Sequence, residues 1–388
     1  MIRLAVEQSQ IQALARDFAD GELCPHAARW DEARALDGDV FAKLADLGFL
    51  GMLVPEGYGG LAFDVPTYLL VLEELARGDA AVALAVAIHC GPVTGMILRH
   101  GTAAQRERWL PRLASGEALG AFALSEPDAG SDAGALSSRA EPCGGGWTLH
   151  GVKRWVTNGA RAGVAVVFAR TASGVGAFLV EPGAPGYRVV GAERTLGVRA
   201  SETVTIELDG VAVEHGALVG GEGDGLKVAL EAIDLGRAGI AAQAVGIARA
   251  AMEHAVAYAI ERHQFGRPLA DFGATQAKLA EMHRRIAAAR ALTHHAGDAL
   301  QAALKGEHPR AGPDGVTARA ATAKLTASEA ATWVADEAVQ IFGGYGYMRD
   351  YPVERLLRDA KGTEIYEGTN EIMRHVIARE VLRAAEHG

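Results

Sequence analysis

The sequence predicts an α+β protein of several domains: an N-terminal α-helical domain, a middle antiparallel β-barrel or sandwich, and a C-terminal four-helix bundle. Three observations predict this order. Apolar residues recur at helical spacing up to about residue 120, short β-type runs follow, and long helical patterns fill the chain after a glycine-rich segment at 220–225. We therefore expect domains at residues 1–120, 121–224 and 225–388.

In the first domain, Ile11, Leu14 and Phe18 follow the spacing of an amphipathic helix. Pro66 suits the first turn of a later helix that continues to Leu75. The stretch 80–88 is apolar on every side, which indicates a helix buried inside the protein. We judge the most apolar stretch of the chain, 79–91, too short to cross a membrane.

The middle domain is indicated by short β-type runs. In 203–208 apolar and polar residues alternate, and Asp209 and Gly210 follow as a turn signal. The last domain begins with long helical patterns over 226–260, 274–304 and 316–341. Their length suits the extended helices of a bundle.

Composition excludes several classes of function. The formal net charge of −10 argues against a nucleic-acid-binding protein and against attachment to an anionic membrane. Cys24, Cys90 and Cys143 are far apart and odd in number, so they form neither a disulfide framework nor a metal site. This usage, together with an N-terminus that lacks a signal-peptide core, predicts a reducing, cytoplasmic setting.

The stretch 364–371 holds the best candidate for a catalytic group. Glu367 lies in a tight loop just ahead of a helix, with Thr369 or Asn370 as the N-cap. Gly368 allows the backbone to approach a ligand closely. A carboxylate on such a loop is a candidate general base. The alternative is an acidic residue that only decorates a helix N-terminus.

Two long segments, 123–132 and 340–347, resemble the signature motifs of the acyl-CoA dehydrogenase family. Shorter landmarks of the family are found at 155–159, 262–266 and 366–369. The resemblance covers essentially the whole chain, and the short-chain type is the most similar through 234–240. It implies FAD as the cofactor, held without a Rossmann fingerprint, and predicts no metal.

The resemblance also implies which residues hold FAD. The hydroxyls of Ser125 and Ser131 would meet the pyrimidine edge of the flavin, Trp155 would lie on one face, and Thr157 would reach N5. The alternatives are a polar turn between domains for the first segment and a barrel core position for Trp155. The implied cofactor-binding set is Phe122, Leu124, Ser125, Ser131, Trp155, Thr157, Arg262, Gln264, Phe265, Gln340, Gly343, Gly344, Thr369 and Glu371.

Within that set, two groups are expected to reach the FAD pyrophosphate and adenine from a neighbouring subunit. They are Arg262, Gln264 and Phe265, and Gln340, Gly343 and Gly344. If so, the site is complete only in a homo-oligomer, which we expect to be a dimer of dimers. The alternatives are a solvated helix end for Arg262 and a loop between helices for the glycines.

For the reaction, the resemblance implies α,β-dehydrogenation of an acyl-CoA thioester. Glu367 would take the α-proton, FAD would accept hydride, and the Glu367 backbone N–H with a flavin ribityl hydroxyl would hold the thioester oxygen. Some members place the base just before Arg237, but this chain has Gly236 there. For the pKa of Glu367 we expect that substrate binding makes burial outweigh the effect of the helix N-terminus that follows it, and so raises the pKa.

The substrate residues implied are Asp234 and Arg237 for the CoA portion, with Ser131 and Gly368 nearby. The alternative for Asp234 and Arg237 is a simple intrahelical ion pair. Arg249 and Arg284 are expected to be surface charges. Leu84 and Ile88 should line the closed end of an acyl pocket for a short to medium chain. A lone histidine, His89, is expected to be structural.

For electron transfer, the resemblance implies electron-transferring flavoprotein as the partner. Three other functions stay open from the sequence alone. They are dehydrogenation of an acyl group tethered to a carrier protein in biosynthesis, a flavin oxidase or monooxygenase on the same fold, and a non-catalytic scaffold.

Overall fold

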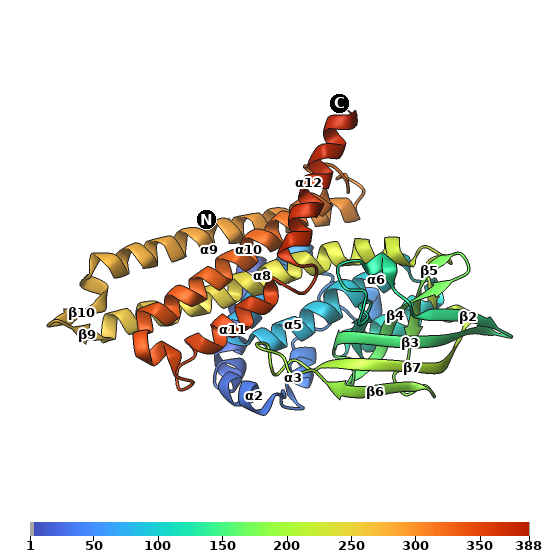
Figure 1. The fold of residues 1–388 in the computed structure, drawn as a ribbon, viewed down its shortest axis with the longest axis horizontal. Helices are drawn as coiled ribbons and strands as arrows, with labels where there is room; N and C mark the ends of the chain where they lie inside the picture. Colours follow the sequence, from blue (N-terminus) through green and yellow to red (C-terminus); the bar gives the residue numbers. More distant parts are fainter. Residues whose placement is uncertain (1–3, 388) are drawn as a thin grey trace.

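The computed structural model describes residues 4–387. Its α-helical N-terminal part, β-sheet and C-terminal helices follow one another in the expected order, with the sheet at one end of the molecule (Figure 1). The fold class is therefore confirmed. The first part contains α1 (Val6–Phe18), η1 (Ala19–Leu23), α2 (Ala27–Ala33), α3 (Val40–Asp46), η2 (Glu56–Tyr58), α4 (Val65–Gly78), α5 (Ala80–Ile88), η3 (His89–Thr94), α6 (Gly95–His100) and α7 (Ala103–Ala114).

Local sequence explains where α4 and α5 begin. Asp64 caps α4 by accepting a hydrogen bond from Thr67 N at 2.9 Å, and Pro66 lies in the first turn as expected. The Asp79 carboxylate caps α5 by accepting from Ala81 N and Val82 N, both at 2.9 Å. Asp79 is also the C-cap residue of α4, so one buried helix ends and the next begins around this single residue.

The apolar stretch that begins at Ala80 is longer than the sequence indicated. Helical structure continues through η3 and α6, giving a 21-residue segment, Ala80–His100, whose most apolar 18-residue window has a mean hydropathy of 1.9. By length and composition it could cross a membrane, so the judgement that it was too short was wrong. However, 89% of its most apolar window is buried inside the protein, which is typical of a core helix.

The middle part is a single eight-stranded sheet with the order β6-β7-β3-β2-β4-β5-β8, and β1 pairs with β4. Its pairs are antiparallel except that β1 runs parallel to β4, and β2 meets β4 through one parallel pair. The strands are β1 (Leu119–Ala123), β2 (Arg139–Cys143), β3 (Gly146–Thr157), β4 (Ala162–Thr171), β5 (Gly174–Val180), β6 (Tyr187–Ala192), β7 (Thr203–Glu214) and β8 (Leu218–Val219), with η4 (Ala133–Ala135) and η5 (His215–Ala217).

Alternation along the strands gives the sheet two apolar faces. In β4, Val164, Val166 and Phe168 belong to the large core shared with the helices, whereas Ala165 and Val167 belong to a separate core made by the strands themselves. The sheet therefore both encloses its own core and packs against the helical parts.

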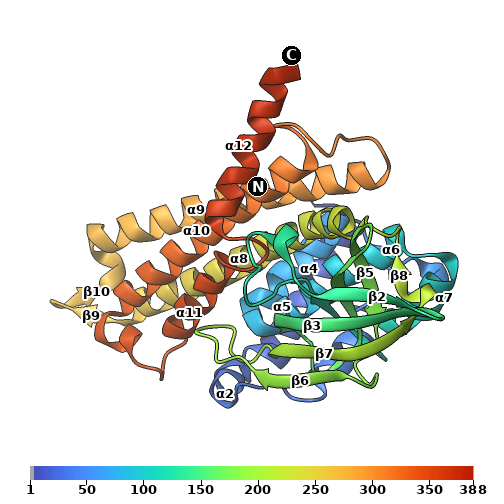
Figure 2. The same ribbon diagram turned by 45° about the vertical axis from the view of Figure 1, so that its right-hand side comes forward.

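The C-terminal part is built around α8 (Gly225–Glu261), which passes through the middle of the molecule in both ribbon views (Figures 1 and 2). The C-terminal helix projects away from the body in the same views. The other elements are β9 (His263–Gln264), β10 (Arg267–Pro268), η6 (Leu269–Asp271), α9 (Gly273–Leu304), α10 (Val316–Phe342), η7 (Gly343–Tyr347), α11 (Val353–Thr363) and α12 (Asn370–His387).

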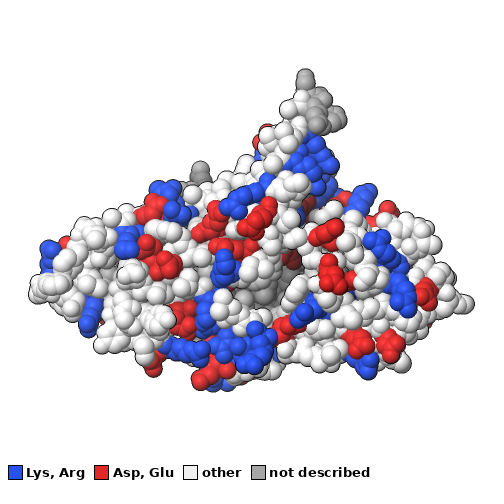
Figure 3. All heavy atoms as spheres, in the orientation of Figure 1, with Lys and Arg blue, Asp and Glu red and all other residues white. Residues whose placement is uncertain are grey.

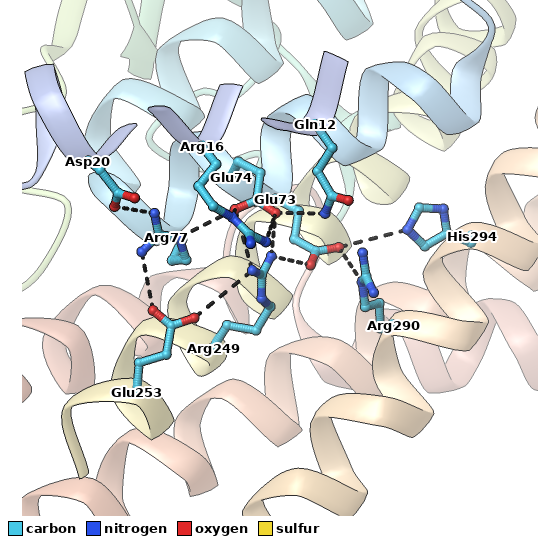
Figure 4. A network of polar contacts seen from close by, with 10 residues as sticks. All are labelled: Gln12, Arg16, Asp20, Glu73, Glu74, Arg77, Arg249, Glu253, Arg290 and His294. Carbon is cyan, nitrogen blue, oxygen red and sulfur yellow. Dashed lines mark hydrogen bonds and ion pairs between the residues drawn. The ribbon is translucent and has the colours of Figure 1, made fainter. Parts of the chain in front are cut away.

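A buried polar network joins the helices α1, α4, α8 and α9 (Figure 4). Glu73 and Glu74 of α4 are almost fully buried. Arg249 of α8 donates to both, at 2.5 Å and 2.8 Å, while Arg16 of α1 binds Glu74 and Arg290 of α9 binds Glu73. Burial would raise the pKa of Glu74, but the hydrogen bonds from Arg16 and Arg249 outweigh it and lower the pKa to about 2.

The expectation of a surface position for Arg249 was therefore wrong, because α4 packs against the face of α8 that carries it. Arg284 is exposed and pairs with Glu281, as expected. On the face seen in Figure 3, acidic and basic side chains are interspersed, apart from a basic band along the lower middle of the view.

Candidate active site

The loop that carries Glu367 joins α11 to α12. Glu367 has φ of 55° and Gly368 has φ of 94°, so the backbone is left-handed at both residues. Thr369 Oγ1 accepts a hydrogen bond from Ile372 N at 3.3 Å and so caps α12, as one of the two predicted caps. On the other side, Asn370 N donates to Glu364 O at 3.0 Å, which closes the loop.

The Glu367 carboxylate points inward. Although part of the residue is accessible, Oε2 is buried and has no hydrogen-bond partner within residues 4–387. It lies against α8, where a Cβ atom at Gly236 would be only 2.6 Å from Oε2. Burial raises the pKa of Glu367 to about 7, against the opposing charges of Arg237 and Lys324. The side chain is thus a buried base that only a residue without a side chain at 236 leaves room for.

Arg237 and Asp234 of α8 lie beside this loop. Both are buried, and Arg237 Nη1 donates to Asp234 Oδ1 at 3.1 Å. Asp234 Oδ2 also accepts from Arg310 at 3.1 Å and from Thr317 at 2.8 Å. Arg237 Nη2 lies 4.0 Å from the position of a Cβ atom at Gly368, and Arg237 Nε is buried without a partner in the described chain. Asp234 and Arg237 thus form an intrahelical ion pair, as the simpler alternative proposed, and this pair also lies beside the loop of Glu367.

The residues expected to contact the flavin ring come together where the strands β1 and β3 end. Ser125 O accepts a hydrogen bond from Arg154 N at 2.9 Å, and the 125–131 loop passes Trp155, whose ring is 3.9 Å from the position of a Cβ atom at Gly130. Trp155 has φ of 58° and is 51% exposed, so it is not a barrel core residue. In the described chain, the hydroxyls of Ser125, Ser131 and Thr157 donate no hydrogen bond to protein atoms, which leaves them free for a ligand.

Phe122 and Leu124 lie at the end of β1, behind that loop. The ring centroids of Phe122 and Phe168 are 5.0 Å apart, and Leu124 is buried with its carbonyl accepting from Lys153 Nζ at 3.1 Å. Lys153 is itself buried and forms an ion pair with Glu126 at 2.7 Å. Sequence reasoning missed this pair, although a lysine inside a strand of otherwise alternating pattern is a signal of it.

Most of the remaining cofactor candidates lie at the end of the helical bundle that is remote from the sheet (Figure 1). There a cavity of about 440 Å³ is lined by residues that include Arg262, Gln264, Gly343 and Gly344. A Cβ atom at either glycine would meet open space, and Phe265 is 93% exposed with φ of 53°. In one chain this group, with Gln340 beside it, is therefore separated from the Trp155 group. Glu371 is exposed in the first turn of α12.

The residues predicted to line the acyl pocket lie on α5, and η3 follows them. Leu84 and Ile88 of α5 are buried, and Pro92 Cγ is 3.2 Å from the position of a Cβ atom at Gly236. His89 is structural, as expected: Gly120 N donates to its Nδ1 at 3.0 Å, and its Nε2 lies 3.1 Å from Leu50 O. Burial lowers the pKa of His89 to about 4, so the ring is neutral.

Sequence reasoning missed Lys324 of α10. Its buried ammonium donates to Gly368 O at 2.7 Å and to Asn370 Oδ1 at 3.0 Å, on the two residues that flank Thr369. No signal in the sequence indicates this, because a charged residue in a helical pattern ordinarily lies on the solvent face.

The residues present fit a flavin dinucleotide. A half-exposed indole beside free hydroxyls suits the ring system, and exposed glycines beside Arg262 and Gln264 suit a pyrophosphate. Among residues 4–387, no group of three or more His, Cys, Asp or Glu side chains is placed to hold a metal ion.

Comparisons with known proteins agree with this geometry. Sequence profiles described as acyl-CoA dehydrogenase N-terminal, middle and C-terminal domain match residues 5–117, 121–211 and 223–382. An acyl-CoA dehydrogenase of Bacillus subtilis is 45% identical over 97% of this chain and 98% of its own length. The mitochondrial short-chain specific acyl-CoA dehydrogenase of Rattus norvegicus is 41% identical over 99% of this chain and 92% of its own.

Solved structures give the same result. Butyryl-CoA dehydrogenase from Megasphaera elsdenii superposes with a TM-score of 0.94 at 40% identity, covering 99% of this chain and 100% of that one. A chain from a structure titled for the electron transferring flavoprotein of Acidaminococcus fermentans has the same TM-score, identity and coverage. A glutaryl-CoA dehydrogenase from Mycobacterium smegmatis in complex with FADH2 has a TM-score of 0.90 at 33% identity, over 97% of this chain and 94% of that one. This chain belongs to the acyl-CoA dehydrogenase family of oxidoreductases.

Proposed function

We propose that this chain oxidises a short-chain acyl-CoA thioester to the trans-2-enoyl-CoA, with Glu367 as the base and FAD as the cofactor. The observation that carries the proposal is the buried Glu367 carboxylate, which has no hydrogen-bond partner in the described chain and lies beside Arg237. A buried acid without a partner costs stability, and such groups concentrate where chemistry needs them.

Each residue then has a distinct role. Glu367 removes the α-proton of the thioester, because its raised pKa matches it to proton abstraction near neutral pH. Its backbone N–H makes no hydrogen bond within residues 4–387, so it is free to stabilise negative charge on the thioester oxygen. FAD, when bound, supplies the hydride acceptor that no side chain can provide.

The side chains packed beneath Glu367 favour a substrate with a short acyl chain. Tyr68 of α4 is fully buried, and its hydroxyl lies 3.2 Å from the Cβ positions of both Gly91 and Gly239. The Cβ position of Gly91 is also 3.9 Å from Cα of Gly236, the residue against which Glu367 packs, and burial raises the pKa of the Tyr68 phenol. With Leu84 and Ile88 already packed, a long chain has no free channel on this side.

The assembly and the partner follow from the same geometry. The Trp155 group and the Arg262 group lie at opposite ends of one chain, so one FAD can contact both only if two copies meet; we propose a homo-oligomer, a dimer of dimers. The structure titled for an electron transferring flavoprotein supports a protein of that class as the electron acceptor. The three cysteines are free, which supports a reducing, cytoplasmic setting.

Anaerobic titration of the purified yellow protein with acyl-CoA esters tests the proposal. We expect rapid bleaching of the flavin by butyryl-CoA and slower bleaching as the chain lengthens, with a Tyr68→Leu variant shifting the optimum to longer chains. Glu367→Gln should retain flavin and lose bleaching by several orders of magnitude. Bleaching by Glu367→Gln at the wild-type rate would refute the assignment of the base.

Two further arms separate the alternatives. A panel of the same acyl groups on an acyl carrier protein would be preferred over CoA esters by a biosynthetic enzyme. Rapid reoxidation of the bleached protein by air, without an added acceptor, would indicate an oxidase instead of a dehydrogenase.

A further inference from the structure

Lys324 is buried where a lysine is costly. Its side chain is 0% exposed in the middle of α10, with Ala320, Ala321 and Ala323 beside it in the sequence. A buried ammonium is expensive unless it is paired, yet within the described chain no carboxylate lies within ion-pair distance of it. Its two hydrogen bonds go to Gly368 O at 2.7 Å and Asn370 Oδ1 at 3.0 Å. The side chain is thus directed at the loop of the base.

That loop needs anchors because its backbone is unfavourable. A residue other than glycine in the left-handed region costs about 1 kcal/mol, and such a conformation persists only when its surroundings impose it. Before Glu367, the Tyr366 hydroxyl donates to Gln243 Oε1 at 3.0 Å. After it, the anchors are Lys324 and the Ser328 hydroxyl, 3.0 Å from Asn370 Oδ1.

We propose that Lys324 is a positioning residue for Glu367: it holds the following peptide so that the carboxylate stays buried, and its positive charge favours the ionised form of the base. This inference rests on the proposed function. It assigns a role to α10, a helix that contributes no atom to the reacting groups.

The charges around Lys324 agree with this role. Glu367 from the loop, Glu364 from the end of α11 and Glu371 from α12 favour the charged lysine, and Arg237 from α8 opposes it. Burial is the largest effect and lowers the pKa of Lys324 to about 7. The lysine in turn lowers the pKa of Glu367. Each group therefore makes the other easier to ionise inside the protein.

Three variants test the proposal. Lys324→Met removes the charge and both hydrogen bonds, Lys324→Arg keeps the charge, and Ser328→Ala removes a neutral anchor of the same Asn370. We would measure flavin reduction by butyryl-CoA from pH 5.5 to 9. We would also measure the protons taken up when acetoacetyl-CoA binds, by calorimetry in two buffers of different ionisation enthalpy.

For Lys324→Met we expect kcat at pH 7 to fall about 10- to 100-fold, with KM changing much less. The midpoint of the pH profile and of the proton uptake should both rise by about one pH unit. Lys324→Arg and Ser328→Ala should keep the wild-type midpoint, even if their kcat falls. If Lys324→Met does not fold, a shifted midpoint in Lys324→Arg would itself overturn the role of the charge.

Other results are equally decisive. An unchanged midpoint and kcat in Lys324→Met would overturn the inference, as would a midpoint in Ser328→Ala that moves as far as that of Lys324→Met. A wild-type protein that no acyl-CoA ester bleaches would instead contradict the proposed function, so the two failures are distinguishable.

Discussion

Gly236→Ala isolates the position of the base from every other property of the site. A Cβ atom there would lie 2.6 Å from Glu367 Oε2, 2.9 Å from its Cδ and 3.2 Å from Pro92 Cγ. Ordinary contacts begin near 3.5 Å, so the carboxylate must move by about 1 Å. Nothing in the described chain hydrogen-bonds Oε2, so it can move. A displacement of this size costs about 100-fold in rate, or about 3 kcal/mol in the barrier.

Stability should respond in a different way from activity. Alanine is favoured over glycine inside a helix by about 1 kcal/mol, while overpacking costs about 1–3 kcal/mol. The free energy of unfolding should therefore change by no more than about 2 kcal/mol, as urea denaturation would show, while kcat falls by two orders of magnitude.

Stopped-flow reduction of the flavin by butyryl-CoA gives the rate for this variant. The control is Gly21→Ala in η1, where no atom lies within 4 Å of the new methyl group. If Gly236→Ala reduces its flavin at the wild-type rate, the carboxylate does not lie against α8 and the reasoning fails.

Four more predictions concern ionisable groups. Since burial raises the pKa of Glu367 to about 7, the rate of flavin reduction should rise with pH and level off above about 7; a flat profile would contradict this. The same shift means that between pH 4.5 and 7 the folded protein binds a proton that the unfolded chain does not. The free energy of unfolding, relative to that of Glu367→Gln, should therefore fall by up to about 3 kcal/mol as the pH rises through that window. Arg249→Met leaves Glu73 and Glu74 with too few cations and should cost about 3–5 kcal/mol in urea denaturation, whereas a loss below about 1 kcal/mol would show that the remaining arginines suffice. Lys153→Met should lower the ratio of flavin to protein, and adding Glu126→Gln should restore part of it, because the lone buried charge is then gone; no recovery in the double variant argues against the pair.

The sequence predicted the order of the elements well, since helical and strand periodicities are local. It did not predict partners. The continuous apolar run of β4 does not specify that β1 runs parallel to it, because a strand buried on both faces has the same pattern in either direction. Arg249 was misplaced because spacing along α8 does not show which neighbouring helices cover each face.

Local sequence patterns also failed to predict which residues of the candidate site contact one another. Glu367 and Arg237 are distant in the sequence, and only the resemblance of motifs placed them in one site; the structure shows how close they lie. Lys324 was overlooked because α10 carries other charged residues, such as Arg319 and Glu329, and a lysine among them looks like a solvated position until the α12 end is seen to cover it.

The separation of the Trp155 group from the Arg262 group has a genetic consequence. Suppose one allele encodes a chain damaged at Trp155 and another a chain damaged at Arg262, and both are expressed together. If two copies share each FAD site as we propose, each mixed dimer has one site with both lesions and one site with none. Two inactive alleles would then complement each other, and co-expression would rescue growth that neither supports alone.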